Sequence, residues 1–226
     1  MTYRVGVVDV VYWSEPDPVR RALIAKDAGY QHIDVSTDVD PASLVLPIGC
    51  PTSFPKPQPG WCTTPAPTDS PDPATHSEIW ERTVRWFKGS PGALLEPWAG
   101  AVVNSVESAK AMMAEVPGLR LLVDTGHVSD WGEDALDMLE FADHVQLRQG
   151  KPGSTQVHID DPSGVVDFTA VRKRLDQLDY QGCVSVEYFD LPDLGWGLDD
   201  PAQWASDLRA HLITVGFGVG FGAPSS

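Results

Sequence analysis

The chain has 226 residues, which is enough for one full-sized hydrophobic core and too few for two comfortable domains. Its formal net charge is −16, with 32 acidic against 16 basic residues, and a surface of this sign repels phosphate backbones, so we expect no nucleic acid partner. No apolar run approaches the roughly 20 residues that cross a bilayer, and no signal-peptide pattern precedes the first strand-like run, so we predict a cytoplasmic protein without a membrane partner.

Short strand-like runs alternate with helix-period runs over most of the chain. Two helix starts carry local signals: Asn104 and Glu107 have capping-box spacing, and Asp200 precedes Pro201 at a predicted first turn. Because a parallel return needs a crossover connection, this alternation predicts parallel strands, in either an open doubly wound sheet or a closed barrel. In chain order, the predicted strands are 4–11, 32–35, 44–48, 94–96, 119–124, 144–147 and 183–188, and the predicted helices are 18–28, 105–116, 133–141, 168–178 and 201–212.

Two segments interrupt this alternation. Residues 50–73 are dense in proline and too long for an ordinary connection, which is typical of a functional lid or a disordered loop. Residues 214–226 are rich in glycine and predict a flexible tail after a single domain over 1–213; because the glycines neither follow a strand nor open a helix, we discard a nucleotide-binding interpretation. The three cysteines are too scattered for a disulfide framework, and although Cys50 and Cys62 bracket a loop and could pair, we expect reduced thiols.

Polar side chains stand at the ends of four predicted strands. Glu96, Asp124 and Glu187 each follow an apolar run directly, and His127 comes three residues after Asp124. Gln146 lies near the end of a fourth strand. Because the carboxyl ends of parallel strands meet at one edge, where sites are built from several strands at once, we expect these side chains to lie close together.

The chemistry of these side chains favours a metal site. A buried carboxylate is costly to desolvate without a counter-charge, and a divalent cation supplies one. Three carboxylates with an amide oxygen or a nitrogen suit manganese, magnesium or zinc, and hard oxygen ligands favour the first two. A single acid after an apolar run is more often a helix cap or a solvated loop residue, and Asp124 before Thr125 and Gly126 also fits simple turn chemistry. Because four such positions fall in consecutive predicted strands, we favour one shared site over four separate cap or loop residues.

Three stretches around these residues resemble the xylose isomerase-like TIM-barrel superfamily, which contains sugar phosphate isomerases and epimerases and the endonuclease IV branch. Residues 121–127 resemble its strand ending in Asp-x-x-His, and 142–147 resemble its strand with a histidine between hydrophobic residues. Residues 167–188 resemble the helix and closing strand that deliver the last glutamate. The resemblance implies an α/β fold of the (β/α)₈ TIM-barrel type. One βα unit is expected to be shortened or irregular, because the proline-rich loop occupies space where relatives carry a strand.

The resemblance also implies a ligand set and a reaction. Carried over by position, one metal ion would be bound by four residues, with His127 next to the substrate or acting as a further ligand. Two glutamates would act as the catalytic acid and base: one removes a proton from the carbon beside a metal-polarised carbonyl, and the other returns one. The implied metal ligands are Glu96, Asp124, Gln146 and Glu187, and the implied catalytic residues are Glu96 and Glu187.

Several positions leave alternatives open. Gln146 stands where the family has a ligand histidine, so either its oxygen coordinates more weakly or His144 or His158 supplies the nitrogen. His158 lies in the following loop, where endonuclease IV relatives keep zinc ligands; it could contact the substrate, or it could equally be a solvated loop residue. Arg148 could hold a substrate carboxylate or phosphate, or form a surface salt bridge. Trp98 could stack on a sugar or pack in the core.

Together these inferences favour a metal-dependent isomerase or epimerase acting on a small hydroxylated substrate such as a sugar or polyol. A lyase or a C-glycoside-cleaving enzyme could use the same site, and a non-catalytic partner subunit with a decayed site would account for Gln146 and the shortened barrel. An endonuclease IV-like hydrolase is disfavoured, because it needs a histidine-rich multi-zinc site and this acidic chain has six histidines. The sequence leaves open whether the chain forms a homo- or hetero-oligomer.

Overall fold

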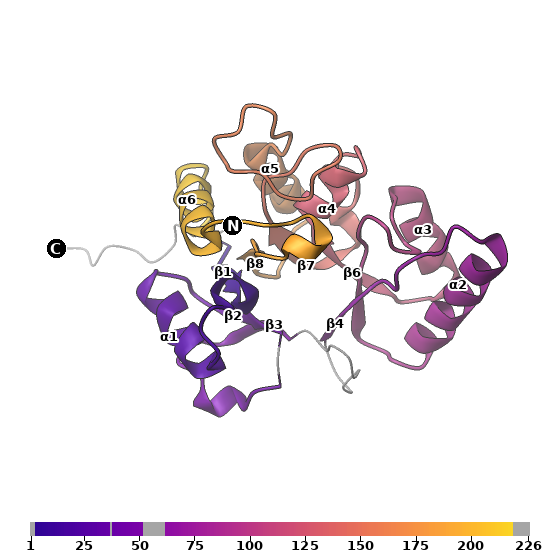
Figure 1. Cartoon of the computed structure of the whole chain (residues 1–226), viewed down its shortest axis with the longest axis horizontal. Helices are drawn as coiled ribbons and strands as arrows, with labels where there is room; N and C mark the ends of the chain where they lie inside the picture. The colour runs from indigo at the N-terminus through magenta and orange to yellow at the C-terminus, as the bar shows by residue number, and fades with distance from the viewer. Residues whose placement is uncertain (1–2, 37, 52–61, 219–226) are drawn as a thin grey trace.

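Eight parallel strands form the interior of the molecule (Figure 1). The structure is a computed structural model and describes residues 3–36, 38–51 and 62–218. The strands pair in the order β3-β2-β1-β8-β7-β6-β5-β4, and β3 and β4, at the two ends of this order, lie next to each other with Cys50 Sγ 2.9 Å from Thr63 Oγ1. The chain is therefore a nearly closed (β/α)₈ TIM barrel, as predicted. The strands are β1 (Val5–Val8), β2 (Ile33–Val35), β3 (Ile48–Pro51), β4 (Cys62–Pro65), β5 (Ala93–Glu96), β6 (Arg120–Asp124), β7 (Ala142–Leu147) and β8 (Val184–Val186).

Helices lie around the outside of the strands (Figure 1). An aspartate N-cap followed by proline starts α1, α2 and α6, the last as the sequence predicts. The capping box of α3 is formed by Ser105 and Ser108, so the predicted pair of Asn104 and Glu107 is wrong by one position. The predicted helix over 133–141 consists of two short 3₁₀ turns. The α-helices are α1 (Pro18–Asp27), α2 (Pro73–Lys88), α3 (Val106–Glu115), α4 (Thr125–Asp130), α5 (Phe168–Gln177) and α6 (Pro201–Thr214).

The largest departures from the predicted elements lie between β2 and β5. β3 begins at Ile48, where the predicted strand ends. The prediction of a continuous loop over 50–73 is wrong, because Cys62–Pro65 form β4 and pair in parallel with β5; residues 52–61 lie outside the described residues. One βα unit is irregular, as predicted, but at another place and for another reason: β2 and β3 are joined by the 3₁₀ turn Pro41–Ser43 in place of an α-helix, whereas the proline-rich segment contains the strand β4.

The C-terminal segment is packed as far as the structure describes it. The sequence predicts a flexible tail over 214–226, but Phe217 is buried and its ring centroid lies 5.8 Å from that of Tyr3. The backbone N–H of Gly218 donates to the Tyr3 carbonyl at 3.0 Å. Residues 219–226 lie outside the described part. Within the described residues, no helix is both long and apolar enough to cross a bilayer.

A layer of polar side chains lies inside the barrel, on the N-terminal side of the strand ends. His144 Nε2 on β7 and Asp34 Oδ2 on β2 are 2.6 Å apart, and both side chains are fully buried. Because β1 and β8 separate these strands in the sheet, the ion pair crosses the barrel interior. Burial alone would lower the pKa of His144, but the charge and hydrogen bond of Asp34 raise it to about 10. Burial alone would raise the pKa of Asp34, and the charge of His144 lowers it.

Candidate functional site

Four buried polar side chains meet at the C-terminal edge of the barrel. Glu96 and Asp124 are the last residues of β5 and β6, and Glu187 directly follows β8. Gln146 lies in β7, where it is paired in register with Asp124. None of the four is more than 9% exposed. The structure therefore brings together the residues that the sequence predicts to share a site, at the edge where TIM barrels carry their active sites.

Asp124 and His127 are positioned by the start of α4. The Asp124 Oδ1 atom accepts hydrogen bonds from the backbone N–H groups of Gly126, at 2.7 Å, and His127, at 3.0 Å. The side chain is thus the N-cap of α4, which confirms the turn interpretation, and it also lies in the polar cluster, where its role as a metal ligand stays a prediction. A single turn of helix after the cap carries His127 over the end of the strand.

The imidazole of His127 is held in one neutral form. Its Nδ1 lies 2.8 Å from Thr155 Oγ1, and its Nε2 lies 3.0 Å from Nη2 of Arg148. Because arginine only donates hydrogen bonds, Nε2 is the acceptor and the proton resides on Nδ1. Burial, followed by the charge of Arg148, lowers the pKa of His127 to about 3. An Nε2 lone pair fixed in this way is the form of histidine that binds metals.

Three of these residues have the types and spacing of a metal site. One ligand atom each of Glu96, Asp124 and His127 lies within 4.8 Å of the other two, and Glu96 Oε1 is 3.8 Å from His127 Nε2. Gln146, predicted as a ligand, contributes a buried Oε1 atom that has no hydrogen-bond partner in the described part of the chain. The residue types therefore match a site for a divalent cation.

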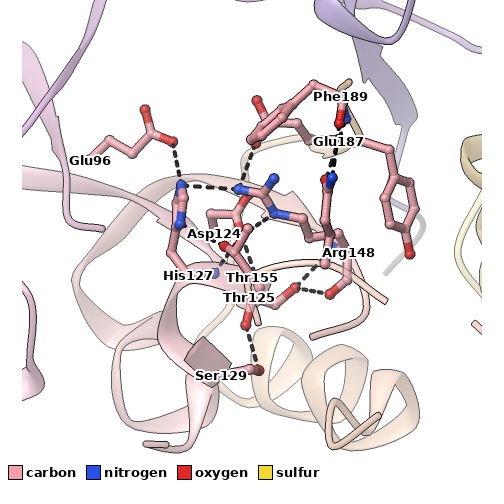
Figure 2. Close-up of polar contacts among 12 residues, drawn as sticks. Glu96, Asp124, Thr125, His127, Ser129, Arg148, Thr155, Glu187 and Phe189 are labelled. Atoms are coloured by element: carbon pink, nitrogen blue, oxygen red, sulfur yellow. Dashed lines mark hydrogen bonds and ion pairs between the residues drawn. The ribbon is translucent and has the colours of Figure 1, made fainter. Parts of the chain in front are cut away.

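Arg148 lies in the middle of this cluster, between His127 and Glu187 (Figure 2). Its side chain is fully buried, so it is not the surface salt bridge that the sequence leaves open. Nη2 is 2.9 Å from Asp124 Oδ2 and 3.1 Å from Glu187 Oε2, and Nε donates to Asp124 Oδ1 at 3.0 Å. The guanidinium carbon lies 4.6 Å from the ring centroid of Phe189. A permanently charged group thus compensates the carboxylates at this edge.

The carboxyl groups of the cluster differ in their proton affinities. Burial, and then the charge of Asp124, raises the pKa of Glu96 to about 7. Burial also raises the pKa of Glu187, although the charge of Arg148 opposes this shift. For Asp124, burial acts in the same direction, but the charge of Arg148, the contact with His127 and the hydrogen bonds together outweigh it and the pKa is lowered. Two glutamates that keep a proton up to a higher pH than ordinary carboxylates therefore stand beside one aspartate whose ionised form is favoured.

A cavity of about 520 Å³ opens over the cluster. Glu96, His127, Gln146 and Glu187 contribute polar groups to its lining, whereas the remaining wall is largely apolar and aromatic. A large apolar surface with a few convergent polar groups is typical of a small-molecule site, and aromatic faces suit the apolar faces of sugars. The aromatic lining residues are Trp13, Trp98, Phe189 and Trp196.

Other predicted residues lie in different surroundings. Trp98 lines the cavity, with its Nε1 donating to the Ala66 carbonyl at 2.6 Å, and its contact with a substrate stays a prediction. The predicted contact His158 pairs with Asp207 at 3.1 Å and is not part of the cavity lining. His144 pairs with Asp34 inside the barrel. His127 is therefore the histidine that joins the cluster, and neither sequence alternative for the missing nitrogen does so.

Three residues that help to form the site are not predicted by the sequence. Trp196 lies in the cavity wall, with its ring centroid 6.3 Å from that of Trp98 in an edge-to-face arrangement. Phe189 covers the guanidinium group of Arg148, and Thr155 fixes the tautomer of His127. All three lie outside the regular helices and strands, where periodicity gives no signal. An aromatic two residues after Glu187 is the only hint that the sequence offers for Phe189.

Comparisons with known proteins agree with this architecture. Among solved structures, the chain is similar to the 3-keto-D-glucoside 4-epimerase of E. coli, with a TM-score of 0.65, 16% identity, and coverage of 94% of this chain and 100% of that chain. It is similar to an L-ribulose 3-epimerase, with a TM-score of 0.66, 18% identity, and coverage of 95% and 96%. It is also similar to the probable 3-DHS dehydratase of Bacillus anthracis, with a TM-score of 0.65, 11% identity, and coverage of 93% and 98%. At these identities the likenesses show the fold.

The amino-acid sequence gives a second comparison. No curated protein sequence matches the chain. A family model described as a xylose isomerase-like TIM barrel matches residues 78–214, which is more than half of the 226 residues and includes all four strand ends of the cluster. The chain therefore belongs to the xylose isomerase-like TIM-barrel family.

Proposed function

We propose that this protein is an isomerase or epimerase of a sugar or related polyol that transfers a proton at the carbon beside a carbonyl group. One observation carries the proposal: Glu96 and Glu187, from strands β5 and β8, line the same aromatic-walled cavity. Either carboxylate can remove the proton while the other returns one to the opposite face or to the neighbouring carbon. Solved structures titled as epimerases share the fold, which supports the same class of reaction.

Several finer expectations stay predictions. The substrate is expected to be small and hydroxylated, because the cavity combines aromatic walls with a polar floor. The cytoplasmic location and the homo- or hetero-oligomeric state rest on the sequence alone. A lyase or C-glycoside-cleaving enzyme would use the same pair of glutamates, and the probable 3-DHS dehydratase of Bacillus anthracis has a similar fold.

The expectation of one Mn²⁺ or Mg²⁺ ion, with Zn²⁺ as the alternative, meets an obstacle in the site itself. Glu96, Asp124 and His127 match a divalent ion by type and spacing. However, Nη2 of Arg148 lies within 3.1 Å of atoms of Asp124, His127 and Glu187. An ion on those atoms would face a guanidinium charge at close range, so it does not fit while Arg148 stays in place. The proposed reaction is therefore derived from the glutamates alone.

A non-catalytic partner subunit is the second candidate, and two observations favour it. Gln146 replaces the ligand histidine expected from the family resemblance, and Arg148 fills the centre of the ligand cluster. Such a chain would keep the barrel and the cavity without turning over a substrate. Measuring proton exchange separates this candidate from the enzyme.

The test is wash-in of solvent deuterium into a panel of ketoses and keto-sugars, followed by NMR. The wild type is expected to exchange the proton beside the carbonyl of at least one compound. Glu187→Gln and Glu96→Gln are each expected to lower the exchange rate by at least about 100-fold, the usual contribution of a positioned acid or base. Glu78→Gln, an exposed glutamate on α2, is the matched control and should keep the wild-type rate. Wild-type exchange that survives both site substitutions, or its absence with every compound, would contradict the proposal.

A further inference from the structure

We infer that the guanidinium group of Arg148 is the resident cation of this centre, in the position where the family resemblance implies a divalent metal ion, and that the chain binds no divalent ion there. This inference concerns what occupies the site. It goes beyond the proposed reaction and holds whether or not that reaction takes place.

The first argument is the position of a single nitrogen atom. Nη2 of Arg148 lies 2.9 Å from Asp124 Oδ2, 3.0 Å from His127 Nε2 and 3.1 Å from Glu187 Oε2. These are two carboxylate oxygens and one imidazole nitrogen, supplied by β6, α4 and the end of β8. They are the ligand types that hold a divalent ion in a mixed oxygen and nitrogen site. One positively charged nitrogen thus donates to His127 Nε2 and lies at ion-pair distance from both carboxylate oxygens, in the place that the ion would take.

The second argument is that the fold holds Arg148 in this position. The hydroxyl of Thr125 accepts a hydrogen bond from the Arg148 backbone N–H at 3.0 Å and donates one to its carbonyl at 2.8 Å. Phe189 covers one face of the guanidinium group at 4.6 Å. The side chain also lies against Gly126, where an added Cβ would come within 2.5 Å of Arg148 Cγ. Backbone, stem and charged head are all fixed, so the side chain is not a mobile surface group that happens to fall into the site.

The third argument is electrostatic. Arg148 is fully buried, and a buried arginine keeps its charge and needs compensating acceptors. Moving it out to admit a metal would break its contacts with Asp124, Glu187 and the ring of Phe189. Because Arg148 does not line the cavity, its role toward the reaction is to position Asp124 and Glu187.

The test measures Mn²⁺ binding in two ways: from the EPR signal of the free ion during a titration, and from metal analysis of the protein after dialysis. The wild type is expected to bind no Mn²⁺ at 1:1 stoichiometry. Arg148→Ser, which vacates the centre and leaves the surrounding ligands, is expected to bind about one ion per chain, at least about 10-fold more tightly than the wild type. Adding Asp124→Asn should abolish that binding. None of these readouts depends on turnover, so the result stays separate from the outcome of the deuterium experiment.

Arg21→Ser is the matched control. Arg21 is the other buried arginine in an ion pair with a buried aspartate, 3.0 Å from Asp9, and its removal should create no Mn²⁺ site. Arg148→Met, which keeps an apolar stem in the same space, is the second variant should the serine variant not fold. If neither folds, the wild-type titration decides.

Two results would overturn the inference. One is stoichiometric Mn²⁺ binding by the wild type that Asp124→Asn abolishes, because the ion would then coexist with or displace Arg148. The other is a folded Arg148→Ser variant that binds no Mn²⁺, because the ligand cluster would then not be a metal position at all.

Discussion

Asp124 shows how one side chain serves two structural purposes in the polar cluster. One carboxylate oxygen caps α4, and both oxygens contact Arg148, so the same residue starts the helix and faces the cluster. The sequence shows the pattern that goes with these two roles, a strand that ends in aspartate with a histidine three residues later. The position of the Arg148 side chain cannot be predicted from the sequence. An arginine just after a strand has the same local pattern whether its side chain points to solvent or into the barrel.

A substitution at Gly126 tests whether the Arg148 side chain needs a residue without a Cβ atom beside it. An alanine there would contact the Thr155 carbonyl and the Arg148 side chain, although alanine normally favours a helix. We therefore expect Gly126→Ala to lower the free energy of unfolding by about 1–3 kcal/mol, the usual cost of overpacking, as measured by urea denaturation. Gly89→Ala is the control, since its nearest neighbour would be at 3.4 Å. An unchanged or raised stability in Gly126→Ala would show that the contact is not tight.

Helices were predictable where a long run of regularly spaced apolar residues follows an N-cap residue. α5 and α6 match their predicted positions closely, because each has an aspartate cap and regularly spaced apolar residues. β4 has only Thr63 and Thr64 as β-branched residues before a proline, a pattern that loops share, and pairing with β5 is what makes it a strand. Local sequence cannot supply that tertiary contact.

The start of α4 provides a test at the level of an element. Asp124→Ala removes a helix cap and also leaves Arg148 as a poorly compensated buried charge. We expect a loss of about 3–5 kcal/mol in the free energy of unfolding, which is the range for breaking a buried ion pair. Asp167→Ala removes only the exposed cap of α5 and should cost about 1 kcal/mol. Urea denaturation measures both variants. An equal loss of unfolding free energy in the two would mean that the ion pair of Asp124 contributes no stability beyond that of its helix cap.

On the scale of the whole molecule, the parallel strands explain why four distant residues meet. Their convergence was predictable from strand order alone, since every C-terminal strand end lies at one edge. The walls of the cavity were not, because they come from loops whose conformation depends on the assembled barrel. The polar layer formed by Asp34 and His144 is also a property of the closed barrel, because it joins strands that are not neighbours.

This layer predicts a pH dependence of stability. The pKa of His144 is raised from 6.5 to about 10 in the folded chain, so its contribution is complete below about pH 6.5 and is lost as the pH rises through 10. We expect the difference in unfolding free energy between the wild type and His144→Gln to shrink steadily from pH 6 to pH 10. Urea denaturation at pH 6, 8 and 10 measures it, and a difference that stays constant would rule out a charged His144.

In the proposed reaction, Glu96 and Glu187 face a common substrate in one cavity. A crystal structure with a bound unreactive polyol tests it most directly. We predict the polyol inside the cavity, stacked on Trp98 or Trp196, with hydroxyl groups within about 3 Å of both glutamate carboxylates, the normal range for hydrogen bonds. A polyol bound elsewhere, or carboxylates of Glu96 and Glu187 that face away from one another, would contradict the account.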